Sequence, residues 1–405
     1  MNKHFFFYIL AVWFVLTQTL PPFNILFPFQ ASLKFLIFDV VTILLFPSLL
    51  SKRSIVALLV YSMVTLVYHF LGNAFFDTIS TVVIPLLIML SGLLIAEYAL
   101  KYDKKYKFTR TIVIVVAITN VFMSLISIPQ VINNPNIIRP SVLEENTEYF
   151  DRYWLITYLT CHGLPLIFAP LIFLFRNSFR DKKWFFICWI MVFLILFIIV
   201  FSSNATTPFL IAIVMVMCGF FFRSERLSTK NIRALILIGL LSLLMVQPVV
   251  VVPVLSSLQK TMDTSSNNYQ RLEELKDDVI YGEAGGDWGV RQDLYATSTR
   301  LFFESPITGT YYPEKISHHS WFLDRLACFG LLFIAPLVFL FIIHIKTMYR
   351  CLIHTKVVYM IGILGFLLML FLKNDFGIGS WLYGFAFLPL ICRYGDYVVD
   401  NKLNK

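Results

Sequence analysis

The sequence contains few charged residues for its length. Of its 405 residues only 14% are Asp, Glu, Lys or Arg, whereas 58% are hydrophobic. A water-soluble protein could not cover its surface with so few charges. The composition therefore excludes a soluble protein and indicates a protein whose solvent is lipid.

Cysteine motifs are also lacking. The six cysteines form no Cys-x-x-Cys pair, and they fall inside apolar runs or at predicted cytoplasmic edges. A disulfide framework would need cysteines in outward loops, and a structural zinc site would need closely spaced ligands. The sequence thus encodes neither, and we expect no metal and no cofactor. The cysteines are Cys161, Cys188, Cys218, Cys328, Cys351 and Cys392.

A signal-peptide cleavage site and internal repeats are missing too. The first apolar run follows Lys3 as a signal peptide would, but it has no Ala-x-Ala-like site and runs into Pro21 and Pro22. We therefore expect this run to be retained as the first helix. No repeat and no low-complexity tract is found elsewhere.

What the sequence does contain is a succession of apolar runs from Phe5 to Cys392. A helix needs about 20 apolar residues to cross the hydrocarbon core. The runs predict an all-α polytopic membrane protein with about twelve transmembrane helices, or about eleven if the segment between Pro21 and Lys34 is re-entrant or a pair is merged. The predicted spans are 5–20, 34–50, 55–72, 78–98, 111–130, 157–175, 184–202, 206–222, 234–254, 318–345, 357–372 and 377–392.

The formal net charge of +9 alone could suggest a nucleic-acid partner, but the basic residues lie mainly in alternate connectors between the predicted spans. By the positive-inside rule these connectors are cytoplasmic, together with both termini. The charge is therefore a topology signal, and we expect no nucleic acid. The connectors are Lys52/Arg53, Lys101–Arg110, Arg176–Lys183, Arg223–Arg233 and Lys346–Lys356.

Two outward segments are too long to be turns, and long loops in compact proteins usually carry function. They divide the chain into six parts. These are helices one to five (1–130), a first outer loop (131–156), helices six to nine (157–254), a large outer loop that we expect to form a catalytic cap (255–317), helices ten to twelve (318–392) and a cytoplasmic tail (393–405).

The large loop and the helix after it contain the most specific string in the chain. An arginine-led amphipathic stretch begins Gly289-Val-Arg291 and ends in Ser305-Pro306-Ile-Thr-Gly309. A second segment follows, His318-His319-Ser320-Trp-Phe-Leu323-Asp324-Arg325, which continues to Gly330. This string resembles the O-antigen polymerase and ligase superfamily. In the pattern of that family Arg291 matches the leading arginine, Pro306 and Gly309 the turn, His319-Ser320 with Leu323 the histidine motif, and Gly330 the glycine of the next helix.

The resemblance implies a GT-C-like fold and a metal-independent, inverting glycosyltransferase. Such an enzyme acts on undecaprenyl-diphosphate-linked oligosaccharides at the outer leaflet of the bacterial cytoplasmic (inner) membrane. The His-Ser form followed by Asp324 looks more similar to surface-polysaccharide polymerases of the Wzy type than to ligases. The bilayer and the lipid-linked glycans are the implied partners, with a chain-length regulator and a flippase as further candidates.

Arginine is suited to stabilise the charge of the departing diphosphate, because its planar guanidinium makes paired hydrogen bonds to phosphate oxygens. Arg291 is the leading catalytic candidate, although it could instead pair with Asp287 or Asp293. Arg300 lies nine residues further on, at the opposite helix face, and Glu304 offers it a surface ion pair. The other substrate-binding arginines that we consider, which could alternatively anchor loops at lipid headgroups, are Arg139, Arg152 and Arg325.

Histidine suits the incoming hydroxyl, which needs a base or an orienting acceptor near neutral pH. His319 is the first candidate, and its alternative is a helix-terminal or headgroup contact. His318 is the second, because it shares a helical stripe with Phe322 and Arg325. If neither serves, a carboxylate must. The remaining substrate-binding candidates are Asp324, Tyr295 and Asp39, which is costly inside an apolar run unless it faces a partner or a wet cavity.

Two rival functions stay open. An O-antigen ligase shares the motifs but passes the finished glycan to another acceptor, such as lipid A core. A flippase for the same lipid-linked sugars belongs to a different class. Transporters usually show paired halves with interrupted helices, whereas this sequence has no visible repeat and concentrates polar residues in one loop. The leading hypothesis is the repeat-unit polymerase for O-antigen, capsule or exopolysaccharide.

Overall fold

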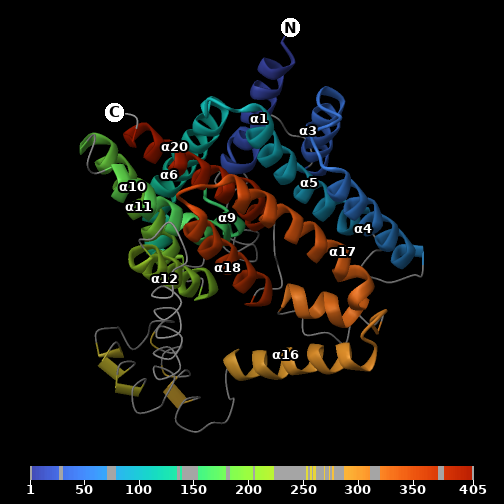
Figure 1. The fold of residues 1–405 in the computed structure, drawn as a ribbon. Helices are drawn as coiled ribbons and strands as arrows, with labels where there is room; N and C mark the ends of the chain where they lie inside the picture. Colours follow the sequence, from blue (N-terminus) through green and yellow to red (C-terminus); the bar gives the residue numbers. More distant parts are fainter. Residues whose placement is uncertain are drawn as a thin grey trace. The chain divides into compact units, whose positions relative to one another are not determined.

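The computed structural model of the chain is all-helical (Figure 1). It describes residues 2–26, 31–70, 79–134, 137–138, 154–178, 183–203, 206–222, 287–310, 320–372 and 378–403, with scattered positions between 252 and 277. Helices and turns make up these residues, and no strand occurs among them. The prediction of an all-α chain is confirmed.

The chain divides into two compact units, which are described separately below. The first unit contains residues 1–225 and 332–405, and the second contains residues 226–331. The first unit holds α1 (Lys3–Thr19), α2 (Phe23–Leu26), α3 (Ala31–Leu45), α4 (Lys52–Phe70), α5 (Ile79–Tyr102), α6 (Lys107–Asn133), α9 (Tyr158–Gly163), η2 (Leu164–Ile167), α10 (Phe168–Ser178), α11 (Lys183–Ser202), α12 (Thr206–Phe221), most of α17 (Trp321–Cys351), α18 (Lys356–Leu372), α19 (Ile378–Leu382), η4 (Tyr383–Phe387) and α20 (Leu388–Leu403).

Several helices are long and apolar enough to cross a membrane. Four of the described segments meet both criteria, namely Lys107–Asn133, Tyr158–Asn177, Lys183–Ser202 and Trp321–Cys351. Thr207–Phe221 and Lys356–Leu372 are shorter apolar helices. These helices support a membrane-embedded protein. Helices also occupy the other predicted spans, but of the span 234–254 only residues 252 and 253 are among the described residues. The twelve-span topology stays a prediction.

Large apolar side chains on the outer faces of several helices are exposed. Examples are Leu44 on α3, Phe70 on α4 and Trp184 on α11. A soluble protein rarely exposes contiguous apolar surface of this kind. Lipid is the environment in which such helix faces are stable.

Two of the predicted spans are interrupted helices that pack on each other. The segment from α9 to α10 tightens into a 3₁₀ turn at η2, where Pro165 lies in the first turn. The segment from α19 to α20 widens into a π-helix at η4. At their contact Gly163 leaves room for the ring of Tyr383, and the Tyr383 hydroxyl donates a hydrogen bond of 2.7 Å to Asn120 Oδ1 on α6. A π-helical turn such as η4 is maintained where tertiary packing supports it.

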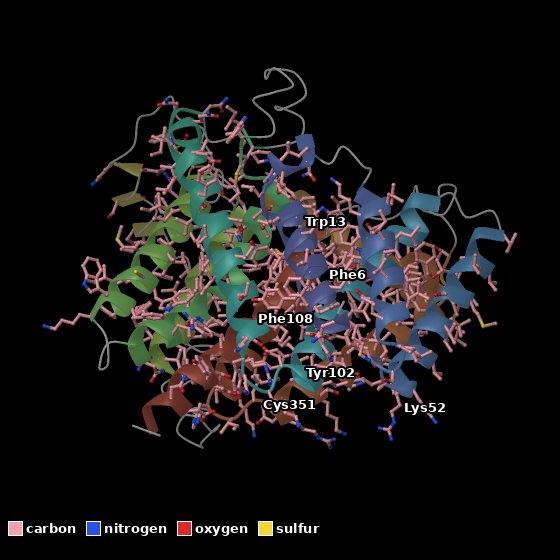
Figure 2. All side chains as sticks on the ribbon, turned by 90° about the horizontal axis from the view of Figure 1, so that it is seen from above. Phe6, Trp13, Lys52, Tyr102, Phe108 and Cys351 are labelled. Atoms are coloured by element: carbon pink, nitrogen blue, oxygen red, sulfur yellow. The ribbon has the colours of Figure 1, made fainter. Side chains whose placement is uncertain are left out.

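Aromatic rings fill the space between α1, α5, α6 and the end of α3. The ring of Phe7 lies 3.9 Å from that of Tyr98 and 5.6 Å from that of Phe108. Phe46 closes the group with an edge contact to Tyr98 at 5.3 Å. Aromatic pairs contribute about 0.5–1.5 kcal/mol each beyond the area that they bury. The group therefore fixes the packing of the N-terminal helices, whose side chains Figure 2 shows.

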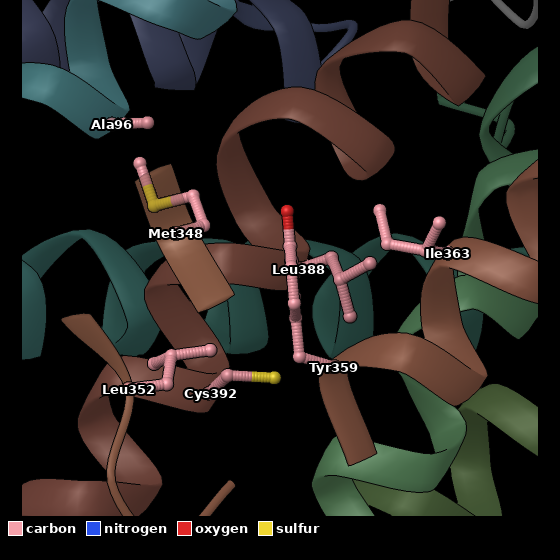
Figure 3. Close-up of a cluster of buried hydrophobic side chains, with 7 residues drawn as sticks. All are labelled: Ala96, Met348, Leu352, Tyr359, Ile363, Leu388 and Cys392. Carbon is pink, nitrogen blue, oxygen red and sulfur yellow. The ribbon is translucent and has the colours of Figure 1, made fainter. Parts of the chain in front are cut away.

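A second core joins the C-terminal helices to α5 (Figure 3). It is formed by seven buried side chains from α5, α17, α18, α20 and the residue after α17. They are Ala96, Met348, Leu352, Tyr359, Ile363, Leu388 and Cys392.

The predicted cytoplasmic tail is largely helical. Residues 393–403 continue α20, because Asp396 accepts hydrogen bonds from the backbone N–H groups of Ile353, His354 and Thr355 at 2.7–2.9 Å. Arg393 reaches across to the carbonyl of Asp103 at 3.0 Å. In Figure 2 Lys52, Tyr102 and Cys351 lie toward one end of the helices of this unit and Trp13 toward the other. The membrane side on which the connectors lie stays a prediction.

Candidate functional site

The second unit carries the string that contains most of the predicted site residues. Its longest described helix is α16 (Asp287–Glu304), which Figure 1 labels. The helix ends there because Pro306 has no N–H to donate and disfavours helical geometry in the residue before it. Residues 305–310 form a turn, and α17 begins at Trp321.

The turn after α16 is fastened to α17 by backbone contacts. Thr310 N donates to Ala327 O at 3.0 Å, and Leu331 N donates to Pro306 O at 2.9 Å. Gly309 and Gly330 have φ angles of 75° and 63°, which side chains other than glycine rarely adopt. The Gly330 conformation also breaks the regular geometry of α17. The turn and the first part of α17 therefore form one fixed piece.

Asp324 and Ser320 cap the start of α17 reciprocally. Ser320 Oγ accepts a hydrogen bond from Leu323 N at 3.2 Å, and Asp324 Oδ2 accepts one from Ser320 N at 3.1 Å. Both residues are buried. This arrangement resembles a capping box, except that the reaching aspartate lies four rather than three residues after the capping serine, and it satisfies backbone N–H groups that a helix end otherwise leaves unpaired. The His-Ser motif thus ends in a fixed helix start.

The second oxygen of Asp324 binds α16. Ser298 Oγ donates a hydrogen bond of 2.7 Å to Asp324 Oδ1, and Ser298 is completely buried. A hydrogen bond to a charged acceptor is stronger than a neutral one, and a buried partner left alone is costly. Asp324 therefore connects α16 to the start of α17.

Arg325 lies next to this connection and stacks along its own helix. Its guanidinium lies 5.9 Å from the ring centroid of Trp321 and 5.7 Å from that of Phe329, one helical turn away on each side. Cation–π contacts of this kind hold an arginine in one orientation. A planar guanidinium so held is suited to bind a phosphate oxygen edge.

Arg300 and Tyr295 lie on α16 in different environments. The Arg300 side chain is 74% exposed, and its Nε lies 3.9 Å from Glu304 Oε1. The ion pair suggested by the spacing is therefore formed, and pairs this exposed contribute little to stability. Tyr295 is half-buried, and its carbonyl accepts a hydrogen bond from Thr299 Oγ1 at 2.7 Å.

Other predicted site residues lie outside the described residues. They are His318, His319, Arg139 and Arg152. Arg291 belongs to α16 by its backbone, but its side chain also lies outside the described part of the chain. The catalytic and binding roles predicted for these residues stay predictions.

Asp39 belongs to the first unit, on α3. It is 1% exposed, and its Oδ1 accepts a hydrogen bond of 2.6 Å from Ser91 on α5. Asp39 Oδ2 and Thr42 Oγ1, one turn later, are buried and have no hydrogen-bond partner among the described residues. The structure gives Asp39 a neighbouring helix's serine as partner, in keeping with the expectation that an intramembrane carboxylate must face one.

Ser298 is a residue of this region that the sequence pattern does not single out. It occurs in the run Thr-Ser-Thr, where any of the three hydroxyls could face the core. A polar group on a buried helix face needs a partner, but Asp324 is 26 residues away in the chain. The spacing of local motifs contains no information about such a contact.

The described site is thus a braced pair of segments. Asp324 binds Ser298 and Ser320, the Gly309 turn binds the Gly330 region, and Arg325 is held beside them. Tyr295 and Arg300 lie on the same α16 that this brace holds. Comparison with protein-family models and with curated proteins finds no match to this chain.

Proposed function

We propose that this chain is a polymerase of undecaprenyl-diphosphate-linked oligosaccharide repeat units, building O-antigen, capsule or exopolysaccharide. It would act by metal-independent, inverting glycosyl transfer in a GT-C-like fold. The enzyme would lie in the bacterial inner membrane with both termini in the cytoplasm and the second unit at the outer leaflet. The positive-inside distribution of Lys and Arg supports this orientation.

The observation that carries the proposal is the folding of the family-like string as one braced unit. Its arginine-led helix and the Pro306–Gly309 turn that follows it are both joined by hydrogen bonds to the Ser320–Gly330 segment, and one of these bonds links Ser298 to Asp324, 26 residues further along the chain. Functional groups must be held by supporting contacts to catalyse a reaction. The residues of the family-like motif are thus also the residues whose contacts hold this part of the chain together.

The chemistry would be a displacement at the anomeric carbon of one lipid-linked glycan. The nonreducing-end hydroxyl of a second glycan attacks that carbon, and the bond from the carbon to the diphosphate oxygen breaks. The lipid diphosphate departs with the electron pair, and the hydroxyl proton passes to a base. Attack from the face opposite the leaving group inverts the centre.

Arg291 would stabilise the charge that develops on the diphosphate, helped by Arg139 or another outer-loop arginine. Position 291 precedes Ser298 by seven residues, which is close to two helical turns, so the two positions follow one stripe of α16. That stripe is the one that Ser298 uses to bind Asp324. The predicted catalytic position therefore belongs to the helix that the Ser298–Asp324 hydrogen bond holds.

His319 would accept or orient the proton of the acceptor hydroxyl. A histidine suits this role because its ordinary pKa lies near neutrality. Arg325, held between two aromatic rings, is the described arginine best placed in the motif for a further phosphate contact.

The test is a reaction with purified protein in lipid nanodiscs and one defined undecaprenyl-diphosphate-linked repeat unit. The proposal predicts a ladder of glycans that differ by one repeat, and the ladder should persist in the presence of a metal chelator. Failure to form any product longer than the substrate, with a folded protein and the correct repeat unit, contradicts the proposal.

The same assay separates the rival functions. An O-antigen ligase would transfer the glycan to added lipid A core and would make no ladder without it. A flippase would move the labelled substrate across a vesicle membrane without changing its length. Either pattern would replace the polymerase proposal.

A further inference from the structure

One carboxylate in the second unit uses both of its oxygens on two separate segments. Asp324 Oδ1 accepts the hydrogen bond of Ser298 Oγ at 2.7 Å, and Asp324 Oδ2 accepts that of Ser320 N at 3.1 Å. Asp324 is 2% exposed, and both partners are completely buried. The carboxylate is thus directed into the protein at both oxygens.

The two partners belong to the segments that carry two predicted catalytic positions. The Ser320 N–H belongs to the peptide bond that links Ser320 to His319. Ser298 follows Arg291 by about two turns of the same helix and on the same stripe. The Asp324 side chain therefore joins the helix that contains Arg291 to the peptide group between His319 and Ser320.

We propose that Asp324 is a positioning residue, which sets the spacing between the Arg291 helix and the His319 segment without touching substrate. The inference rests on the proposed function, since it assigns roles for that reaction. Buried carboxylates that accept two hydrogen bonds in fixed directions are suited to this task, because charged acceptors make the stronger bonds. An error of about 1 Å between catalytic groups lowers a rate by about 100-fold.

This role differs from substrate binding in its kinetic signature. A residue that binds substrate raises KM when it is removed, whereas a residue that aligns the reacting groups lowers kcat. The burial of Asp324 and the use of both oxygens by protein donors favour the second pattern.

The experiment compares three variants in the polymerisation assay. Asp324→Ala removes both of these hydrogen bonds, Asp324→Asn retains one acceptor, and Ser298→Ala removes the hydrogen bond from Ser298 on α16 to Asp324. We expect Asp324→Ala to lower kcat by about 100-fold with KM within about twofold of the wild type. Ser298→Ala should lower kcat by about tenfold, and Asp324→Asn should fall between the wild type and Asp324→Ala.

Thr299→Ala is the matched control. Thr299 is the neighbour of Ser298 and also donates a hydroxyl hydrogen bond, but its acceptor is the Tyr295 carbonyl of the same helix, at 2.7 Å. Its removal should leave kcat and KM unchanged. A raised KM with wild-type kcat in Asp324→Ala, or equal losses in Ser298→Ala and Thr299→Ala, would overturn the proposal.

Amide hydrogen exchange provides a readout that does not depend on glycan synthesis. Asp324→Ala should speed exchange at the Ser320 amide by about tenfold, because that N–H loses its acceptor. Unchanged exchange there would overturn the proposal. If Asp324→Ala does not fold, the kcat values of Ser298→Ala and Asp324→Asn test the positioning role in its place.

The two proposals fail in different ways. If the wild type makes a ladder and all three variants make it equally fast, the positioning role is wrong and the polymerase function stands. If the wild type makes no ladder, the polymerase function is wrong and the positioning role falls with it, even where exchange shows that Asp324 braces the two segments.

Discussion

Gly309 and Gly330 lie backbone against backbone, each in a positive-φ conformation. A Cβ atom added to Gly309 would overlap the carbonyl of Cys328, and one added to Gly330 would overlap the carbonyl of Ile307 and the N–H of Gly309. Two chain segments that approach this closely leave no space for a side chain. The contact joins the turn after α16 to the point where α17 departs from helical geometry.

Alanine at either glycine should destabilise the protein. The substitution Gly309→Ala or Gly330→Ala adds left-handed backbone strain and a steric overlap, together about 2–5 kcal/mol. We expect a lower Tm in detergent and loss of the glycan ladder. The control is Gly365→Ala on α18, whose added Cβ meets side-chain atoms rather than backbone, namely the flexible end of Met215 and, at 3.4 Å, the Leu166 side chain. A Tm for Gly309→Ala equal to that of the wild type would contradict the close backbone contact between Gly309 and Gly330.

Removal of either predicted catalytic side chain should reduce polymerisation while the protein stays folded. Loss of one group that stabilises transition-state charge typically costs about 10²–10³ in kcat, so we expect a loss of that size for Arg291→Ala. Loss of a general base costs about 10²–10⁴, which sets the expectation for His319→Ala. Rates of ladder growth at saturating substrate measure both.

The matched control for these variants is Arg350→Ala. Arg350 is an exposed arginine in the last turn of α17, on the predicted cytoplasmic side. Its removal should leave the rate unchanged. Full activity in both Arg291→Ala and His319→Ala would contradict the proposed roles, even if the chain is a polymerase.

The hydrogen bond from Tyr383 to Asn120 should be a measurable source of stability. Both residues are buried, and Tyr383→Phe leaves Asn120 Oδ1 without the donor that now lies at 2.7 Å. An unsatisfied buried acceptor costs about 1–3 kcal/mol. Tyr359→Phe is the control, because the Tyr359 hydroxyl has no hydrogen-bond partner among the described residues. Equal effects on Tm in the two variants would contradict this account of η4.

Asp396 should make stability depend on pH in a defined direction. Burial raises the pKa of its carboxyl above the ordinary value of 3.8, and hydrogen bonds from Ile353, His354 and Thr355 offset this only in part. The folded state then holds the proton more tightly than the unfolded state. The contribution to stability is complete below pH 3.8 and is lost as the pH rises through the folded pKa.

The variant Asp396→Asn cannot titrate at this position and should lack that slope. The Tm difference between wild type and Asp396→Asn should therefore become less favourable to the wild type as the pH is raised from about 4. Thermal unfolding in detergent over a pH series measures it. A difference that grows in favour of the wild type with rising pH would contradict the raised pKa.

The helix positions could be predicted from the sequence, but the breaks within them could not. Apolar runs indicate the helix at 107–133, predicted at 111–130, because hydropathy depends on local composition alone. The π-helix at Tyr383–Phe387 depends instead on Gly163 and Asn120, which belong to distant segments. The helical continuation of α20 through 393–403 likewise depends on the contacts of Asp396 with His354 and Thr355, the two residues before α18.

In the candidate site too, local features could be predicted from the sequence and contacts between separate segments could not. The Arg300–Glu304 pair follows from a spacing of four residues on one helix, and the sequence predicts it. The cap at Ser320 is also local. The bond from Ser298 to Asp324 and the contact of Gly309 with Gly330 join separate segments, so only the folded chain reveals that the motif residues support one another.

The most direct measurement of the central claim is the length of the lipid-linked glycan that accumulates in cells that lack this chain. A polymerase consumes single repeat units, so its loss should leave undecaprenyl diphosphate carrying one repeat unit, and restoring the chain should remove it. Mass spectrometry of extracted lipids gives the length. Accumulation of a full-length polymer on the lipid would mean that polymerisation proceeds without this chain, and it would contradict the proposed function.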